Sequence, residues 1–203
     1  MSICKKLLEE SCKDACIGPC GCYKYGPANI DATMRIYLSR RKDTTFKRPA
    51  FRERAGDVMI EFLDLFEGQV LLWPMFGTLL GLVRGGDIIP HDEDIDIGFF
   101  KSEEERLLSI LDHIHGKNGF HVIRNQFKSI YTIWKDDVFI DLYMYERTET
   151  EQINQGHRHF YNMITSEAFP FKKISFRDRQ LNCIAEPEAW LERYYGHDWQ
   201  TPK

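Results

Sequence analysis

The feature of this chain that most constrains its fold is an acidic run set into an apolar strand pattern. Carboxylates occupy four of the five positions from 92 to 96, and isoleucine and phenylalanine fill the segment as far as residue 100. Along a β-strand, this alternation sends Asp92, Asp94 and Asp96 to one face and the isoleucines to the other. Carboxylates one pleat apart, with Cα atoms about 6–7 Å from each other, repel unless water, protons or a cation lies between them. The segment therefore predicts a core strand that carries a divalent-cation site.

A second acid favours this interpretation over an acidic turn in solvent, which is the usual fate of Asp-rich runs. Asp141 lies within the otherwise apolar segment 139–143, where an unpaired charge would be costly. We expect Asp141 to share a cation with Asp94 and Asp96. Mg²⁺ fits such a site, because it takes oxygen ligands and is commonly bound by one or two carboxylates together with substrate phosphates.

A glycine turn before the acidic run indicates a place for phosphate. Residues 70–75 have the apolar pattern of a buried strand, and Gly77 and Thr78 open a short helix that reaches Arg84. Free N–H groups and the helix dipole at such a start can receive phosphate oxygens, and Thr78 is expected to cap the helix. Arg84 is either a bidentate phosphate donor or an ordinary surface arginine.

The remaining periodicities indicate one mixed α/β (α+β) domain in which helices flank a sheet. Apolar spacing predicts a helix from Val58 to Phe66 that Gly68 ends. Ser102 and Glu105 form a predicted capping box for a helix to about His115. The other expected elements are a strand hairpin of residues 129–134 and 138–145, joined across 135–137, and a helix from Pro187 that Gly196 ends.

Residues 1–48 form a predicted Cys-rich N-terminal extension, and residues 49–203 form the predicted catalytic domain. Five of the six cysteines lie in the first 22 residues. One Zn²⁺ could take four of them, although their spacing matches none of the usual paired knuckles; disulfides and a reduced tail are the alternatives. The four candidate zinc ligands are Cys12, Cys16, Cys20 and Cys22.

Charge and hydropathy exclude several classes of partner. A formal net charge of -4 and a pI of about 6.0 indicate no footprint for nucleic acid. The first ten residues carry interspersed charges instead of the apolar stretch of a secretory signal. The uncharged run 70–83 is shorter than the roughly 20 residues that cross a bilayer. We therefore expect a cytoplasmic protein without a membrane segment.

Two long motifs together resemble the signature of the LicD family, which includes the fukutin-related proteins. The first runs from Phe76 to Arg84 as Phe-Gly-Thr-Leu-Leu-Gly-Leu-Val-Arg, and the second from Ile89 to Ile97 as Ile-Pro-His-Asp-Glu-Asp-Ile-Asp-Ile. Residues 195–202, Tyr-Gly-His-Asp-Trp-Gln-Thr-Pro, are similar to the ending of such domains. The resemblance covers about residues 55–202. His91 departs from the tryptophan usual in the family, and Glu93 from a frequent aspartate.

The resemblance implies a nucleotidyltransferase-like fold and a role for each matching residue. Gly77 and Thr78 would hold phosphate, Asp94, Asp96 and Asp141 would be catalytic metal ligands for Mg²⁺ or Mn²⁺, and Asp92 would support them. Characterised members transfer a phosphorylated alcohol, such as phosphocholine or ribitol phosphate, from a CDP conjugate to a glycan. The implied partners are a CDP-activated donor and a carbohydrate acceptor.

Two alternatives to this function stay open. A nucleotidyltransferase that moves NMP from an NTP would use the same three acids. A catalytically silent binding module would keep the fold and use the Cys-rich extension for assembly, although the presence of every motif acid argues against it.

Overall fold

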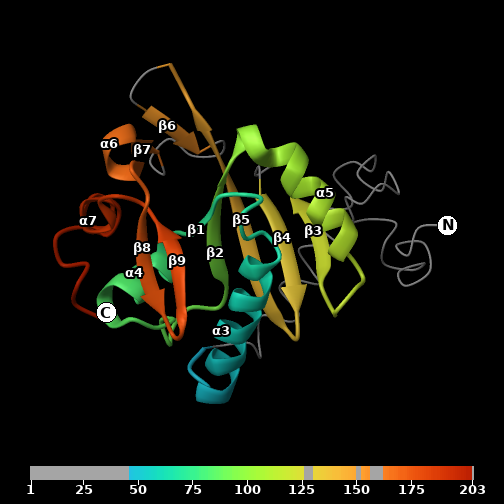
Figure 1. The fold of residues 1–203 in the computed structure, drawn as a ribbon. Coiled ribbons are helices and arrows are strands. Elements are labelled where there is room, and N and C mark those ends of the chain that lie inside the picture. Colours follow the sequence, from blue (N-terminus) through green and yellow to red (C-terminus); the bar gives the residue numbers. More distant parts are fainter. Residues whose placement is uncertain (1–45, 126–129, 150–151, 156–161, 203) are drawn as a thin grey trace.

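A computed structural model describes residues 46–125, 130–149, 152–155 and 162–202 of the 203-residue chain. Five strands lie side by side in the order β1-β2-β5-β4-β3, and β6 and β7 continue from β5 (Figure 1). Only the β2–β5 pair is parallel among these pairings, so the sheet is mixed, as predicted. The strands of this sheet are β1 (Leu72–Pro74), β2 (Ile95–Phe100), β3 (His121–Asn125), β4 (Ile130–Lys135), β5 (Val138–Arg147), β6 (Gln152–Gln155) and β7 (Met163–Ile164).

Helices and a second, two-stranded sheet flank the main sheet. Figure 1 shows α3 and α5 crossing one side of the strands, with α6, α7 and the β8–β9 hairpin gathered beside β1. No helix within the described ranges is both long and apolar enough to span a bilayer. The remaining elements are α3 (Pro49–Asp64), α4 (Phe76–Gly85), η3 (Lys101–Glu103), α5 (Glu104–Ile114), α6 (Thr165–Ala168), β8 (Lys172–Phe176), β9 (Arg179–Cys183) and α7 (Pro187–Tyr195).

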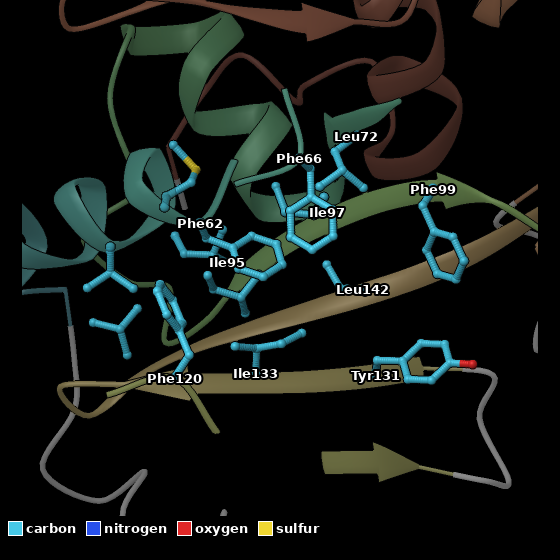
Figure 2. Packing of buried hydrophobic residues seen from close by; sticks show 14 of the residues in the cluster. Phe62, Phe66, Leu72, Ile95, Ile97, Phe99, Phe120, Tyr131, Ile133 and Leu142 are labelled. Carbon is cyan, nitrogen blue, oxygen red and sulfur yellow. The ribbon is translucent and has the colours of Figure 1, made fainter. Parts of the chain in front are cut away.

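Side-chain alternation on β2 and β5 divides the interior into two apolar clusters. On one face, Ile95 and Ile97 pack with Leu142 under α3 and α5. Figure 2 shows Phe62 of α3 and Phe66, just beyond the end of α3, near these residues; the ring centroids of the two phenylalanines are 4.9 Å apart. The opposite face carries the second cluster, to which α4 and α7 contribute. Asp96 lies between the two isoleucines in the chain, so its side chain belongs to this opposite face.

The β4–β5 hairpin closes as the sequence predicts, through a tight turn. Lys135 pairs with Val138, which leaves Asp136 and Asp137 as the loop. Their φ angles are 51° and 65°. Positive φ at both central residues is what a two-residue type I′ turn requires, and aspartate tolerates this conformation better than most residues.

The predicted capping box at Ser102 and Glu105 is wrong. α5 begins at Glu104 after the short η3 turn, and its N-cap residue Glu103 makes no side-chain capping bond. The Glu103 carboxylate instead accepts a hydrogen bond from the backbone N–H of Leu71 at 3.1 Å. The N-cap side chain of α5 therefore bonds to a segment distant in the chain, and no local capping bond forms.

The four candidate zinc ligands lie outside the described residues, as does nearly all of the predicted extension. The described part begins at Phe46, whose side chain is fully buried and packs on the ring of Phe51 at 5.7 Å. The backbone N–H of Phe46 also bonds to the carbonyl oxygen of Asp92 at 3.3 Å. The last residues before α3 therefore pack against the domain.

Candidate active site

A row of acids crosses the middle of the sheet. Asp96 on β2 and Asp141 on β5 are register partners in the parallel pair. Neighbouring strands are about 4.8 Å apart, so the two carboxylates start from adjacent positions on the same face. Asp96 is 7% exposed, whereas Asp141 is half-buried. Strand pairing thus brings together two acids that are distant in the chain, as the sequence analysis expected.

The start of α4 is tied to the acid strand by two hydrogen bonds. Thr78 Oγ1 accepts from the backbone N–H of Asp96 at 2.8 Å, and the N–H of Met75 donates to the Asp96 carbonyl at 2.9 Å. Thr78 is 1% exposed, and the N-cap of α4 is Met75, which makes no side-chain cap. The prediction that Thr78 caps the helix is therefore wrong, because its hydroxyl bonds to β2 instead.

A pocket of about 370 Å³ opens over this junction. Its polar lining residues are His91, Asp92, Asp94 and Asp96. Its aromatic lining residues come from α4, β5 and the end of α7. The further lining residues are Phe76, Gly77, Leu80, Ile89, Tyr143, Tyr194 and Tyr195.

The aromatic lining residues pack against one another through ring-to-ring contacts. The ring of Phe76 meets Tyr143 edge-on at 4.7 Å and Tyr194 at 5.4 Å. Tyr194 in turn stacks on Trp190 with its ring centroid 5.0 Å away, and Tyr195 meets Tyr194 edge-on at 4.6 Å. α7 therefore supplies two tyrosines at its carboxyl end, and the buried Trp190 supports them from behind.

The electrostatics of the site oppose negative charge on Asp96. Burial raises the pKa of this carboxyl group well above its usual value, and the nearby carboxylates of Asp94, Asp92 and Asp141 raise it further. A hydrogen bond from the Tyr143 hydroxyl acts in the other direction. The pKa of Tyr143 is itself raised, first by burial and then by the charge of Asp96, so this hydroxyl keeps its proton. A bound cation would relieve the repulsion among these acids.

The absence of a side chain at Gly77 makes room for the Asp92 carboxylate. A Cβ atom added there would lie 1.9 Å from Asp92 Oδ2. The Asp92 carboxylate therefore packs against the first turn of α4, where backbone N–H groups have no partner within the helix. Any side chain at this position would displace the acid.

The structure separates the predicted site residues into two groups. Asp92, Asp94, Asp96 and Gly77 line the pocket, and Asp141 adjoins Asp96 without lining it. The other two predicted phosphate-binding residues do not line it, because Thr78 is buried and the Arg84 guanidinium reaches the Trp199 carbonyl at 3.5 Å. Arg84 lies seven residues after Gly77, roughly 10 Å along the helix.

Sequence reasoning missed the three tyrosines that line the pocket. Tyr143 could have been found by parity, since it follows Asp141 by two residues and so lies on the same face of β5. Tyr195 belongs to the terminal motif, but nothing local indicates that α7 turns its end towards the acids. The packing of α7 on α4 brings the end of α7 towards the acids, and this packing is a tertiary contact.

The donor set suits a hard divalent cation, because every candidate ligand is a carboxylate oxygen. Within the described ranges, no three His, Cys, Asp or Glu side chains are gathered closely enough to form a ready-made metal cage. Mg²⁺ seldom needs one, since it keeps waters and takes ligands from substrate phosphates. The residues present therefore fit an ion that one or two of these acids hold together with a phosphorylated substrate.

Comparison with known proteins identifies relatives of this domain. A family model described as "LicD/FKTN/FKRP, nucleotidyltransferase domain" matches residues 69–183, which hold all the strands from β1 to β9. A protein of Rickettsia typhi named only as uncharacterised is 27% identical over 133 residues, which are 64% of this chain and 41% of that protein. The ribitol-5-phosphate transferases FKTN of Homo sapiens and Macaca fascicularis are each 25% identical over 167 residues, 79% of this chain and 36% of theirs. The chain thus spans about two fifths of the length of these relatives.

Solved structures show the same fold. The crystal structure of ANT(2'')-Ia with adenylyl-2''-tobramycin has a TM-score of 0.51 and 16% identity, and the match covers 72% of this chain and 78% of that one. The solution structure of ANT(2'')-Ia gives a TM-score of 0.53 at 16% identity, over 74% and 75% of the two chains. The fold is therefore that of the nucleotidyltransferases, as the sequence predicts. Since the family model covers more than half of the chain and spans all four acids of the site, this protein belongs to the LicD/FKTN/FKRP family.

Proposed function

We propose that this chain is a metal-dependent transferase that moves a phospho-alcohol or phospho-sugar from a CDP-activated donor to a glycan hydroxyl. The observation that carries the proposal is the position of Asp96, a buried acid close to three other carboxylates that lines a pocket with both acidic and aromatic residues. Membership of the family and similarity to proteins named ribitol-5-phosphate transferases support ribitol phosphate as the type of group transferred, and phosphocholine is the other type that the family resemblance implies.

The acidic and the aromatic lining residues suit the two ends of such a donor. The acids Asp94, Asp96 and Asp141, with Asp92 beside them, would hold Mg²⁺ or Mn²⁺, which would neutralise the diphosphate and stabilise the departing CMP. The first turn of α4 at Gly77 presents backbone N–H groups towards the same region. The rings of Phe76, Tyr194 and Tyr195 would take the flat cytosine base, because bases stack on aromatic side chains.

The reaction is a single displacement at phosphorus. The oxygen of the acceptor hydroxyl would bond to the phosphorus that carries the alcohol, its proton would pass to a carboxylate of the site, and the bond from that phosphorus to the bridging oxygen of CMP would break. The tasks of the protein are to align these groups and to exclude water, since phosphoryl transfer is catalysed mainly by positioning and charge stabilisation. The buried floor of the pocket, formed by Asp96 and Phe76, serves both tasks.

Release of CMP from a panel of CDP conjugates tests this function. The full chain would be incubated with Mg²⁺, a glycan mixture and CDP-ribitol, CDP-choline or CDP-glycerol, and CMP would be measured by chromatography. We expect Mg²⁺-dependent CMP release from at least one donor and its loss in Asp94→Asn. Release of pyrophosphate from an NTP, without CMP release from any conjugate, would instead identify a nucleotidyltransferase. Binding of CDP without turnover of any substrate would identify a silent module.

A further inference from the structure

A threonine on β4 contacts the acid row from outside the pocket. Thr132 is the cross-strand partner of Asp141, and its hydroxyl donates a hydrogen bond to Asp141 Oδ1 at 2.5 Å. The residues on either side of it, Tyr131 and Ile133, are buried in the core on the opposite face. Asp96, Asp141 and Thr132 therefore occupy one row across three adjacent strands.

A tyrosine gives the neighbouring acid a matching contact. Tyr143 lies two residues after Asp141 on β5, and its hydroxyl donates to the Asp96 carboxylate. Its ring is held edge-on by Phe76, with centroids 4.7 Å apart. Each of the two paired acids thus receives a hydrogen bond from a hydroxyl whose own position is set by a strand.

The hydrogen bonds to Asp141 and Asp96 restrain two carboxylate side chains that can rotate. Two carboxylates that face each other across neighbouring strands repel, and each side chain can rotate away from the other. An ionised carboxylate has about four lone-pair sites, so one hydroxyl donor can fix its direction and still leave capacity for a cation. Groups that orient metal ligands in this way change metal affinity or activity by about 10–100-fold when they are removed.

We propose that Thr132 and Tyr143 are positioning residues that hold the Asp141 and Asp96 carboxylates in the orientation required by a divalent cation. The inference rests on the proposed function, since the cation is the one that would bind the donor diphosphate. It adds a requirement for two hydroxyl groups, each of which acts on the cation through the carboxylate to which it donates. Thr132 does not line the pocket, so its effect must pass through Asp141.

Titration with Mn²⁺ separates a positioning role from a structural one. Binding to the full chain would be followed by the loss of the electron paramagnetic resonance signal of free Mn²⁺, with and without excess CDP. Thr132→Val removes the donor while keeping the shape and a residue that strands favour, and Tyr143→Phe keeps the ring. We expect each variant to bind Mn²⁺ about 10–100-fold more weakly than the parent chain.

Thr132→Ser is the matched control, because it restores the hydroxyl without the methyl group. The Mn²⁺ affinity of Thr132→Ser should lie within about threefold of that of the parent chain. In the activity assay, variants that bind Mn²⁺ more weakly should need more Mn²⁺ for half-maximal CMP release. If Thr132→Val and Tyr143→Phe bind Mn²⁺ as tightly as the parent, or if Thr132→Ser is as weak as Thr132→Val, the positioning role is refuted and the proposed function stands. If the parent chain binds no Mn²⁺ in either condition, the cation of the proposed function and the positioning role are both refuted.

Discussion

Replacing Asp96 with asparagine should stabilise the cation-free protein while abolishing its activity. At an effective dielectric constant of about 20, two unit charges about 5 Å apart repel by about 3 kcal/mol. The Asp96 and Asp141 carboxylates start from neighbouring strands, so this is the scale of the repulsion that the substitution removes. For a domain of this size, about 3 kcal/mol corresponds to a rise in melting temperature of roughly 6–12 °C. Solvent screens this pair, whereas burial of Asp96 and the carboxylates of Asp94 and Asp92 also oppose its charge, so the range gives the scale of the rise in melting temperature.

The effect should depend on pH with a defined sign. The pKa of Asp96 in the folded protein is raised above its usual value of 3.8, so the folded state binds a proton more tightly than the unfolded state does. Such a group favours folding fully below the unfolded pKa, and this contribution is lost as pH rises towards the folded pKa. The parent and Asp96→Asn should therefore melt at similar temperatures near pH 4, and the advantage of the variant should grow as pH is raised to 8.

Melting curves over this pH range, with and without Mg²⁺ and CDP, measure the effect. Ile97→Ala is the matched control on the same strand: Ile97 is fully buried, and its truncation should cost about 2–5 kcal/mol at every pH. Mg²⁺ with CDP should stabilise the parent and Ile97→Ala but not Asp96→Asn. A lower melting temperature for Asp96→Asn at pH 8 without cation, or an advantage that does not vary with pH, would refute the reasoning.

Three further substitutions or modifications follow from the packing. Gly98→Ala should destabilise the domain by about 1–3 kcal/mol in chemical denaturation, because the new Cβ would lie 2.5 Å from the Trp73 ring, whereas Gly85→Ala meets nothing within 4 Å and should be neutral or stabilising. Tyr195→Ala should raise the KM for the active CDP donor by about 5–100-fold through loss of base stacking, and Tyr195→Phe should change it little; an unchanged KM in the alanine variant would show that the base lies elsewhere. Burial raises the pKa of the Cys183 thiol to about 11, so peptide mass spectrometry should find Cys183 unmodified by iodoacetamide at pH 8 in the folded protein and modified in urea; rapid native labelling would contradict this.

The sequence predicts the parts of the site that lie within one continuous segment. Local motifs identify Asp94, Asp96 and the turn at Gly77, because each of these residues is interpreted from its close neighbours in the chain. Strand parity places Asp96 on the face opposite the isoleucines, as observed. Asp141 was predictable for a different reason, because a charge inside an apolar strand requires a partner.

The parts that escaped prediction depend on tertiary contacts. The hydroxyl of Thr78 bonds to the backbone of β2, so the predicted cap at Thr78 is absent. The predicted capping box of Ser102 and Glu105 is also absent, and the adjacent Glu103 carboxylate bonds to the distant backbone N–H of Leu71. The β8–β9 hairpin had no predicted strand, because its residues are largely exposed and polar and it forms a two-stranded sheet of its own. Apolar and polar residues do alternate from Ile174 to Phe176 and from Leu181 to Cys183, but each run holds only two apolar residues, too few to predict a strand from periodicity.

The parallel pairing of β2 with β5 has a consequence for the kinetics of folding. These strands adjoin although α5, β3 and β4 lie between them in the chain, so Asp96 meets Asp141 only after this long crossover has closed. Contacts of such sequence separation form slowly, because the loop-closure entropy is lost before the contacts stabilise the chain. A cation that needs both acids therefore has no binding site on the nascent or unfolded chain. Mg²⁺ with CDP should slow the unfolding limb of a chevron plot and leave the refolding rate unchanged, as expected for contacts that are absent from the transition state.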